Sequence, residues 1–180
     1  MHRLTVLVPT IALVLATSLT AATPVIGVVQ ASGQFRVNQA IADGTATLFD
    51  GAVLETTDAR TDVALKSGGG HIALAPNSKA RVFTNHMALE SGAADVNAPG
   101  YSIEVASLSI SGAGGQVVLD SPGRVRVGAT SHALEVRNAK GTLLARVHSG
   151  HALEFDRAFD SPAQHGGQSG ASVGSPSAAN

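Results

Sequence analysis

The chain of 180 residues contains no cysteine and no tryptophan, and aromatic residues make up only 3% of it. The absence of cysteine excludes disulfide bonds, thiolate metal sites, a cysteine nucleophile and a lipid anchor on a cysteine after a leader. Apolar residues reach 44%, which is enough for a core. Because few large side chains are present to span a wide gap, we expect thin stacked sheets whose backbones lie close together.

Clusters of basic residues are missing as well. The 12 Lys and Arg residues nearly balance the 13 Asp and Glu residues, for a formal net charge of −1, and they are scattered along the chain. A nucleic-acid surface needs grouped cations to displace counterions from phosphates, so the composition argues against a nucleic-acid partner.

The first 22 residues have the pattern of a secretory signal peptide. Arg3 supplies a positive charge, residues 4–16 form an apolar run, and Thr20-Ala21-Ala22 offers small residues for cleavage. The alternative is an uncleaved anchor, but the run is shorter than the roughly 20 apolar residues of a spanning helix and is interrupted by Pro9. We therefore expect a periplasmic or secreted protein whose mature chain has no stable membrane insertion.

The opposite end of the chain has the composition of a disordered tail. Residues 159–180 consist mostly of Ser, Gly, Ala, Gln and Pro, which bury too little apolar surface to offset the entropy of ordering. The predicted organisation is a signal peptide at 1–22, a β-domain at 24–158 and a disordered tail at 159–180.

Residues 50–78 carry the clearest structural signal in the β-domain. They predict three short strands at 52–56, 61–66 and 71–75, each followed by a turn, with alternating apolar residues that face inward. Glycine or another turn residue interrupts nearly every window long enough for a helix, so we predict an all-β fold. The other predicted strands are 25–30, 34–38, 80–84, 87–90, 93–97, 101–106, 107–111, 116–119, 124–127, 132–136 and 151–155.

Several turns and one repeat bear on the architecture. Residues 31–33 predict a hairpin or a sharp corner, and Asp43-Gly44, Asp50-Gly51 and Ser91-Gly92 predict turns. The pentapeptide at 132–136 recurs almost unchanged at 151–155 and more loosely at 86–90, which is typical of stacked rungs or arises by chance in an Ala- and Leu-rich chain. The predicted fold is a short β-solenoid-like or two-sheet β-domain.

Two groups of side chains have some features of reactive sites. His148 and His151 have a spacing found in zinc sites, but Ser149-Gly150 between them predicts a turn flanked by two exposed histidines. Carboxylate pairs catalyse glycoside hydrolysis, yet such sites normally add aromatic platforms. Turn positions explain the carboxylates better; they are Asp43, Asp50, Asp58 and Asp62.

Glycine-rich segments do not supply a catalytic motif either. Residues 68–70 and 112–115 lack the Lys-Ser/Thr and the following helix of a phosphate loop. Gly170-Ala171-Ser172-Val173-Gly174 matches a nucleophile elbow by letters alone, without the flanking strand and helix. We expect no enzymatic activity, no cofactor and no metal site.

The stretch 27–97 resembles the FecR-domain family of bacterial periplasmic proteins. The resemblance rests on the order of short motifs along the chain: Val37-Asn38, Asp50-Gly51, Leu54-Glu55-Thr56, Val63-Ala64-Leu65, Gly70, Ile72-Ala73-Leu74, Pro76-Asn77-Ser78 and Leu89-Glu90-Ser91-Gly92. It implies a periplasmic signalling or interaction module. In the best-known members this domain relays the state of an iron-siderophore transporter to a sigma factor, through a cytoplasmic anti-sigma segment that we do not expect in this protein. We expect an envelope sensing or interaction module with an unknown envelope protein or polymer as partner; alternatives are a structural or polymer-binding role and a polysaccharide-active enzyme.

Overall fold

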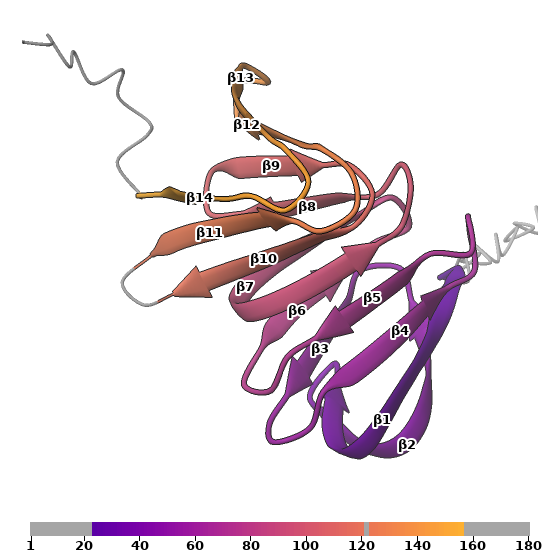
Figure 1. Ribbon diagram of the computed structural model, residues 1–180. Coiled ribbons are helices and arrows are strands. Elements are labelled where there is room, and N and C mark those ends of the chain that lie inside the picture. Colours follow the sequence, from indigo (N-terminus) through magenta and orange to yellow (C-terminus); the bar gives the residue numbers. More distant parts are fainter. Residues whose placement is uncertain (1–22, 121–122, 157–180) are drawn as a thin grey trace, which may run out of the picture.

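The computed structural model describes residues 23–120 and 123–156, and this part of the chain consists of strands joined by turns (Figure 1). The prediction of an all-β fold is confirmed, and no membrane-spanning helix occurs within these ranges. The predicted signal peptide and tail lie outside the described residues. The strands are β1 Val25–Val37, β2 Ala40–Phe49, β3 Ala52–Thr56, β4 Thr61–Leu65, β5 His71–Leu74, β6 Lys79–Val82, β7 His86–Asn97, β8 Ser102–Val105, β9 Leu108–Ser111, β10 Gly115–Asp120, β11 Arg124–Ala129, β12 Leu134–Asn138, β13 Leu143–Val147 and β14 Ala152–Phe155.

Six strands close into a barrel in the order β1-β3-β6-β7-β5-β4 and back to β1. The long strands β1 and β7 make the closure possible because each pairs with both sides of the barrel. Residues 27–31 of β1 pair with β4, whereas residues 35–37 pair with β3. β7 likewise pairs with β6 through its first half and with β5 through its second half.

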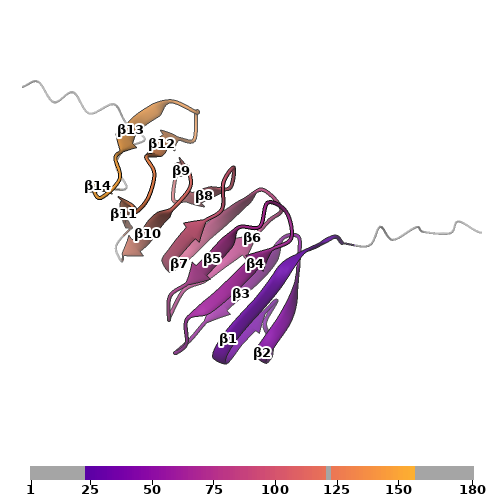
Figure 2. The ribbon, with the colours of Figure 1, turned by 45° about the vertical axis from the view of Figure 1, so that its right-hand side comes forward.

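Two branches extend the barrel beyond β7. The first continues through β8, β9, β12 and β13, and the second through β10, β11 and β14. We call β3, β6 and the first branch the first wall, and β4, β5 and the second branch the second wall. Figure 2 shows the resulting stack, with β1 and β2 at one end and β13 and β14 at the other.

The pairing is not specifically that of a solenoid. A parallel β-helix pairs successive rungs in parallel, whereas among the described strands β7–β8 is the one parallel pair and the others are antiparallel. The repeated pentapeptide does not mark equivalent rungs, because it contributes to β12 in the first wall and to β14 in the second. Leu134 is buried, but its counterpart Leu153 is 41% exposed.

The two strands that serve both walls bend where the sequence predicted turns. β1 runs through residues 31–33 as a corner, so the hairpin alternative is wrong. β7 continues through Ser91-Gly92, where a turn was predicted; Gly92 has φ +83°, and an added Cβ would lie 2.3 Å from Ser78 Oγ. Glycine therefore permits both the bend and the close approach. Asp43-Gly44 was also predicted to be a turn, but it lies inside β2, opposite the corner of β1.

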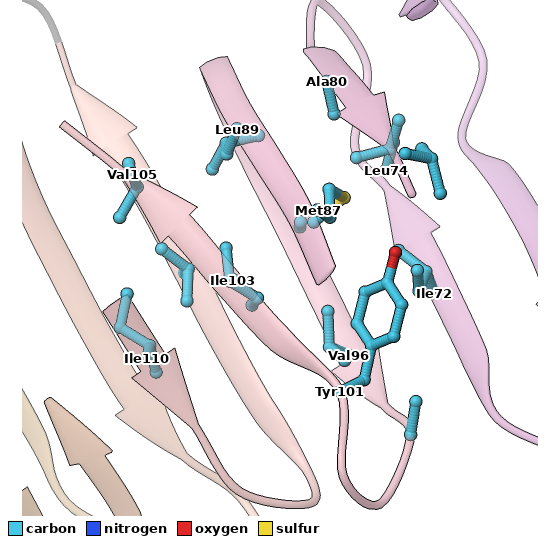
Figure 3. Packing of buried hydrophobic residues seen from close by; sticks show 14 of the residues in the cluster. Ile72, Leu74, Ala80, Met87, Leu89, Val96, Tyr101, Ile103, Val105 and Ile110 are labelled. Carbon is cyan, nitrogen blue, oxygen red and sulfur yellow. The ribbon is translucent and has the colours of Figure 1, made fainter. Parts of the chain in front are cut away.

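The core lies between the walls and consists mainly of aliphatic side chains. In Figure 3, Ile72 and Leu74 from β5 lie near Met87 from β7, with Ile103 from β8 beside them. Ala52, Ala80 and Ala94 are all buried, and their small side chains let the backbones approach each other. This packing agrees with the expectation from the shortage of aromatic residues.

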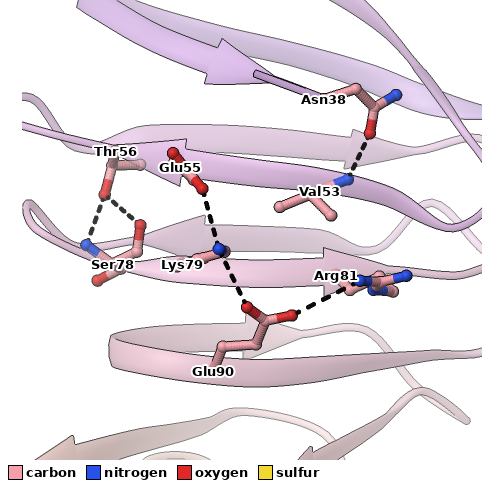
Figure 4. A network of polar contacts seen from close by, with 8 residues as sticks. All are labelled: Asn38, Val53, Glu55, Thr56, Ser78, Lys79, Arg81 and Glu90. Atoms are coloured by element: carbon pink, nitrogen blue, oxygen red, sulfur yellow. Dashed lines mark hydrogen bonds and ion pairs between the residues drawn. The ribbon is translucent and has the colours of Figure 1, made fainter.

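A pair of buried hydroxyl groups joins the first wall to the bend of β7. The Thr56 hydroxyl accepts the Ser78 N–H at 2.9 Å and lies 3.2 Å from Ser78 O (Figure 4). It also donates to Ala75 O at 2.6 Å. Ser78 Oγ in turn accepts the N–H of Ala93 at 3.0 Å. Thr56 and Ser78 are only 4% and 2% exposed, so water cannot readily replace these hydrogen bonds.

Candidate interaction surfaces

The histidine pair lies in the exposed turn between β13 and β14. The N–H of His151 donates to His148 O at 3.0 Å, and His151 Nδ1 lies 3.1 Å from Ser149 O. The described part of the chain contains no group of three or more His, Asp or Glu side chains that could hold a metal ion. The pair therefore has the geometry of the turn that the sequence indicated.

The four aspartates of the N-terminal half, Asp43, Asp50, Asp58 and Asp62, do not gather at one place. Asp50 accepts the backbone N–H and the hydroxyl of Thr84, at 2.7 and 2.8 Å, and so holds the turn before β3 against the end of β6. Asp62 on β4 lies 3.5 Å from Arg60. Asp43 is exposed on β2, and Asp58 is exposed in the β3–β4 connection.

In each of the glycine-rich segments 68–70 and 112–115, at least one glycine lies too close to neighbouring residues for a larger side chain. A Cβ on Gly70 would lie 2.3 Å from Ala98 Cβ, and one on Gly114 would collide with Ser131. Both segments connect strands rather than opening a helix. The motif at Gly170–Gly174 lies outside the described residues.

A polar groove of about 510 Å³ crosses the outer face of the second wall. Ala73 of β5 pairs with Asp62 on one side and Asp95 on the other, so a small side chain separates two carboxylates. Arg60 bridges them, with nitrogen–oxygen distances of 3.5 Å to Asp62 and 3.1 Å to Asp95. The remaining polar lining residues are His71, Asn97, Thr130 and Ser131.

The groove offers hydrogen-bonding groups for a polar ligand. Asp62 and Asp95 are both ion-paired with the Arg60 guanidinium. The sequence did not indicate this site, because Arg60 and Asp95 are 35 positions apart and meet only through the β4–β5–β7 order.

Exposed apolar side chains gather at the two ends of the stack. Within the described ranges, the large hydrophobic residues that are exposed lie on β1 and β2 or on β13 and β14, and not on the strands between them. They are Val25, Val28, Ile41 and Phe49 at one end, and Leu143, Leu144 and Leu153 at the other. Neither residues 40–49 nor 143–147 were predicted as strands, although the Leu143-Leu144 doublet after Gly141 was an available signal.

Each end also presents unpaired backbone. β2 is paired only with β1, β13 only with β12 and β14 only with β11 in the described part of the chain. Directly before β14, His151 O accepts the N–H of Ala129 on β11 at 3.0 Å. Because antiparallel strands direct alternate residues to opposite edges, Leu153 bonds toward β11 while the N–H and C=O groups of Ala152 and Glu154 point outward.

Charged pairs on the outer faces hold the C-terminal strands. Arg126 of β11 donates through Nε to Glu154 of β14 at 2.9 Å. Glu135 of β12 accepts from Arg146 of β13 at 2.6 Å and from Arg137 at 2.9 Å. The hydrogen bond from Arg146, followed by that from Arg137, lowers the pKa of the Glu135 carboxyl.

No protein-family model matches this chain, and neither a curated protein nor a solved structure is significantly similar to it. The resemblance to the FecR-domain family therefore stays a prediction that rests on its motifs.

Proposed function

We propose that this chain is an exported, non-enzymatic β-domain that binds another component of the cell envelope at an end of its stack. The observation that carries the proposal is the concentration of exposed apolar side chains and unpaired strand edges at the ends. The partner is an extended segment of an envelope protein that adds as a strand beside β14. The resemblance to periplasmic FecR-like modules supports the same class of function.

The β14 edge provides both main-chain hydrogen bonds and an apolar side chain for an added strand. The outward backbone groups of Ala152 and Glu154 supply main-chain hydrogen bonds, which need no special side chains. Leu153 pairs with the buried Val127 and is still 41% exposed, because no described strand lies on its other side. An added strand would cover Leu153 and extend the second wall.

Capture from an envelope extract tests this proposal, with strand-edge variants of the bait. Ala152→Pro removes an outward N–H at the first position of β14, where proline is tolerated, and Leu153→Asp charges the apolar contact. We expect both variants to lose the captured protein, whereas Asp58→Ala, at an exposed position in the β3–β4 connection, keeps it. Equal capture by all four baits, or no capture above background, would refute the proposal.

Export is tested separately by cell fractionation. We expect the protein in the periplasm or the medium, and in the cytoplasm after deletion of residues 2–22. Cytoplasmic location of the intact chain would contradict the export part of the proposal.

The polar groove favours a second candidate, which is binding of a surface polymer. Its hydroxyl, amide and charged groups fit a polar chain better than an apolar one. A glycan array would show binding that Asp95→Ala weakens, with the exposed Asp58→Ala as the control. Absence of any glycan signal would remove this candidate.

A further inference from the structure

The edge strand β2 differs from an ordinary protected edge. It is ten residues long and carries a single charged residue, Asp43, with neither lysine nor proline. Long edges of this kind tend to pair with another strand, and proteins usually block them with charges or proline. Figure 2 shows β2 at the end of the stack, beside β1.

The hydrogen bonds of β1 determine which backbone groups of β2 are unpaired. The Asp50 N–H donates to Pro24 O at 3.0 Å, so the backbone of residues 48 and 46 is also directed at β1. At the other end, the Asn38 N–H bonds Val53 O of β3, which turns residues 37 and 35 of β1 toward β2 positions 40 and 42. By alternation, the outward N–H and C=O groups of β2 belong to residues 41, 43, 45, 47 and 49.

This outward set is self-complementary when two copies pair antiparallel about Thr45. Ile41 of one copy then lies opposite Phe49 of the other, and Asp43 lies opposite Thr47. Ile41 and Phe49 are 67% and 42% exposed in the single chain. All five positions fall in hydrogen-bonded pairs, which gives about ten main-chain hydrogen bonds across the axis.

The neighbouring strand β1 extends the match. Within each chain, Val25 pairs with Phe49 and Arg36 pairs with Ile41. A row of side chains therefore crosses the dimer perpendicular to the strands at each end of the β2–β2 pair. It contains Val25 and Phe49 of one copy, followed by Ile41 and the aliphatic stem of Arg36 of the other. The central row contains Gln30 and Thr45 from each copy, which are all polar. The end row is therefore mainly apolar and the central row polar, while the row between them joins Val28 and Thr47 of one copy to Asp43 and Gln34 of the other.

Other registers lose this match. A shift of two positions in one direction places the Asp43 carboxylate opposite Phe49, and a shift in the other direction places Ile41 opposite Thr47. A shift of one position removes the hydrogen bonds, because it sets outward backbone groups against inward ones.

The inward side of β2 fits the same arrangement. Ala42 and Ala46 pack against the core but are only partly buried, because β2 is the last strand. In the Thr45 register Ala42 lies opposite the partner's Leu48, and Gly44 lies opposite the partner's Ala46. A twofold axis along the sheet normal preserves the bend at Gly44 in both copies, so the two cores become continuous.

We infer that the protein forms an end-to-end homodimer through antiparallel pairing of β2 with β2 of a second copy, with Thr45 on the twofold axis. This interface lies at the opposite end of the stack from β14, so it is independent of the proposed partner contact. The dimer presents two β14 ends at its poles, which allows bivalent binding to a repeated or membrane-bound partner.

Single cysteines test the register directly, because the chain has none of its own. Across the axis, two Cα atoms of a hydrogen-bonded pair are about 5.5 Å apart, within the range for a disulfide. Thr45→Cys should therefore give covalent dimers on mild oxidation. Thr47→Cys is the matched control: its two copies would lie about 13 Å apart along the strands and should stay monomeric on a denaturing gel. A mixture of Thr47→Cys with Asp43→Cys should give covalent heterodimers.

Sedimentation of the purified protein over a concentration series measures the association itself. We expect a monomer–dimer equilibrium that Thr45→Pro weakens by at least about tenfold, because proline deletes an outward donor in both copies. Far-UV circular dichroism should show that this variant keeps its fold. Sedimentation as a monomer throughout, or equal cross-linking of Thr45→Cys and Thr47→Cys, would overturn the inference.

Discussion

Replacing Thr56 by valine removes one buried hydroxyl from the junction of β3, the β5–β6 turn and the bend of β7, and leaves the shape of the side chain almost unchanged. The change takes away the acceptor of the Ser78 N–H and the donor to Ala75 O. The backbone hydrogen bond from Thr56 N to Ser78 O, at 2.9 Å, remains. The substitution therefore isolates the contribution of a buried polar group, without creating a cavity.

The expected loss follows from the two groups that the hydroxyl serves. A buried donor or acceptor without a partner costs about 1–3 kcal/mol. The Ser78 N–H is buried and Ala75 O is partly buried, so together they should give a free-energy loss of roughly 3 kcal/mol. That is a large fraction of the 5–15 kcal/mol of a typical domain. The midpoint of thermal unfolding should fall by roughly 10 °C.

Urea unfolding measures this loss, with the adjacent residue as control. Thr57→Val makes the same chemical change at an exposed position, where the hydroxyl contacts Gln34 O at 3.4 Å, and should cost less than about 0.5 kcal/mol. Far-UV circular dichroism and the fluorescence of Tyr101, the one tyrosine in a chain without tryptophan, should give coincident transitions with unchanged slope. Equal stability of the two variants would refute the reasoning.

Two sets of substitutions and one pH titration test other features of the same structure. Thr61→Val should stabilise the protein by about 1 kcal/mol in urea, because the Thr61 hydroxyl is fully buried without a hydrogen-bond partner; a loss of stability would contradict this. Gly92→Ala should destabilise more than Gly68→Ala in the same assay, since both have positive φ but only the former brings a Cβ against Ser78. Burial raises the pKa of the Tyr101 phenol, so its contribution to stability should be complete below about pH 10 and be lost as the pH rises further. Absorbance at 295 nm, which reports ionisation of the phenol, should then change together with the circular dichroism, which reports unfolding. Ionisation of Tyr101 near pH 10 while the protein stays folded would contradict the raised pKa.

The strands of the central stretch were predictable because their signals are local. β3 has the predicted bounds, and β4 and β5 differ from prediction by one residue each. Val63 and Leu65 are buried as their alternation indicated. Each of these features depends on the period of two along one strand, which the residues themselves carry.

The candidate surfaces were not predictable in the same way. The groove needs Ala73 between Asp62 and Asp95, and this arrangement depends on the order β4–β5–β7 rather than on any motif. The exposed apolar ends were missed because β2 and β13 were not recognised as strands. In β2 the Asp43-Gly44 pair has the composition of a turn, but its Gly44 forms a bend inside the strand.

The sequence by itself determined the β class, the spacing of strands and turns, and the inward faces of the central strands. The sequence also showed a glycine at position 92, which indicates a change of chain direction. It did not show whether the strand ends or bends there, because glycine with positive φ occurs both in turns and in bends within a strand. Only the tertiary structure decided that β1 and β7 pair with both walls, close the barrel and leave β2, β13 and β14 as edges. The physical reason is that strand pairing uses backbone groups common to all residues, so the choice of partner depends on the assembled fold.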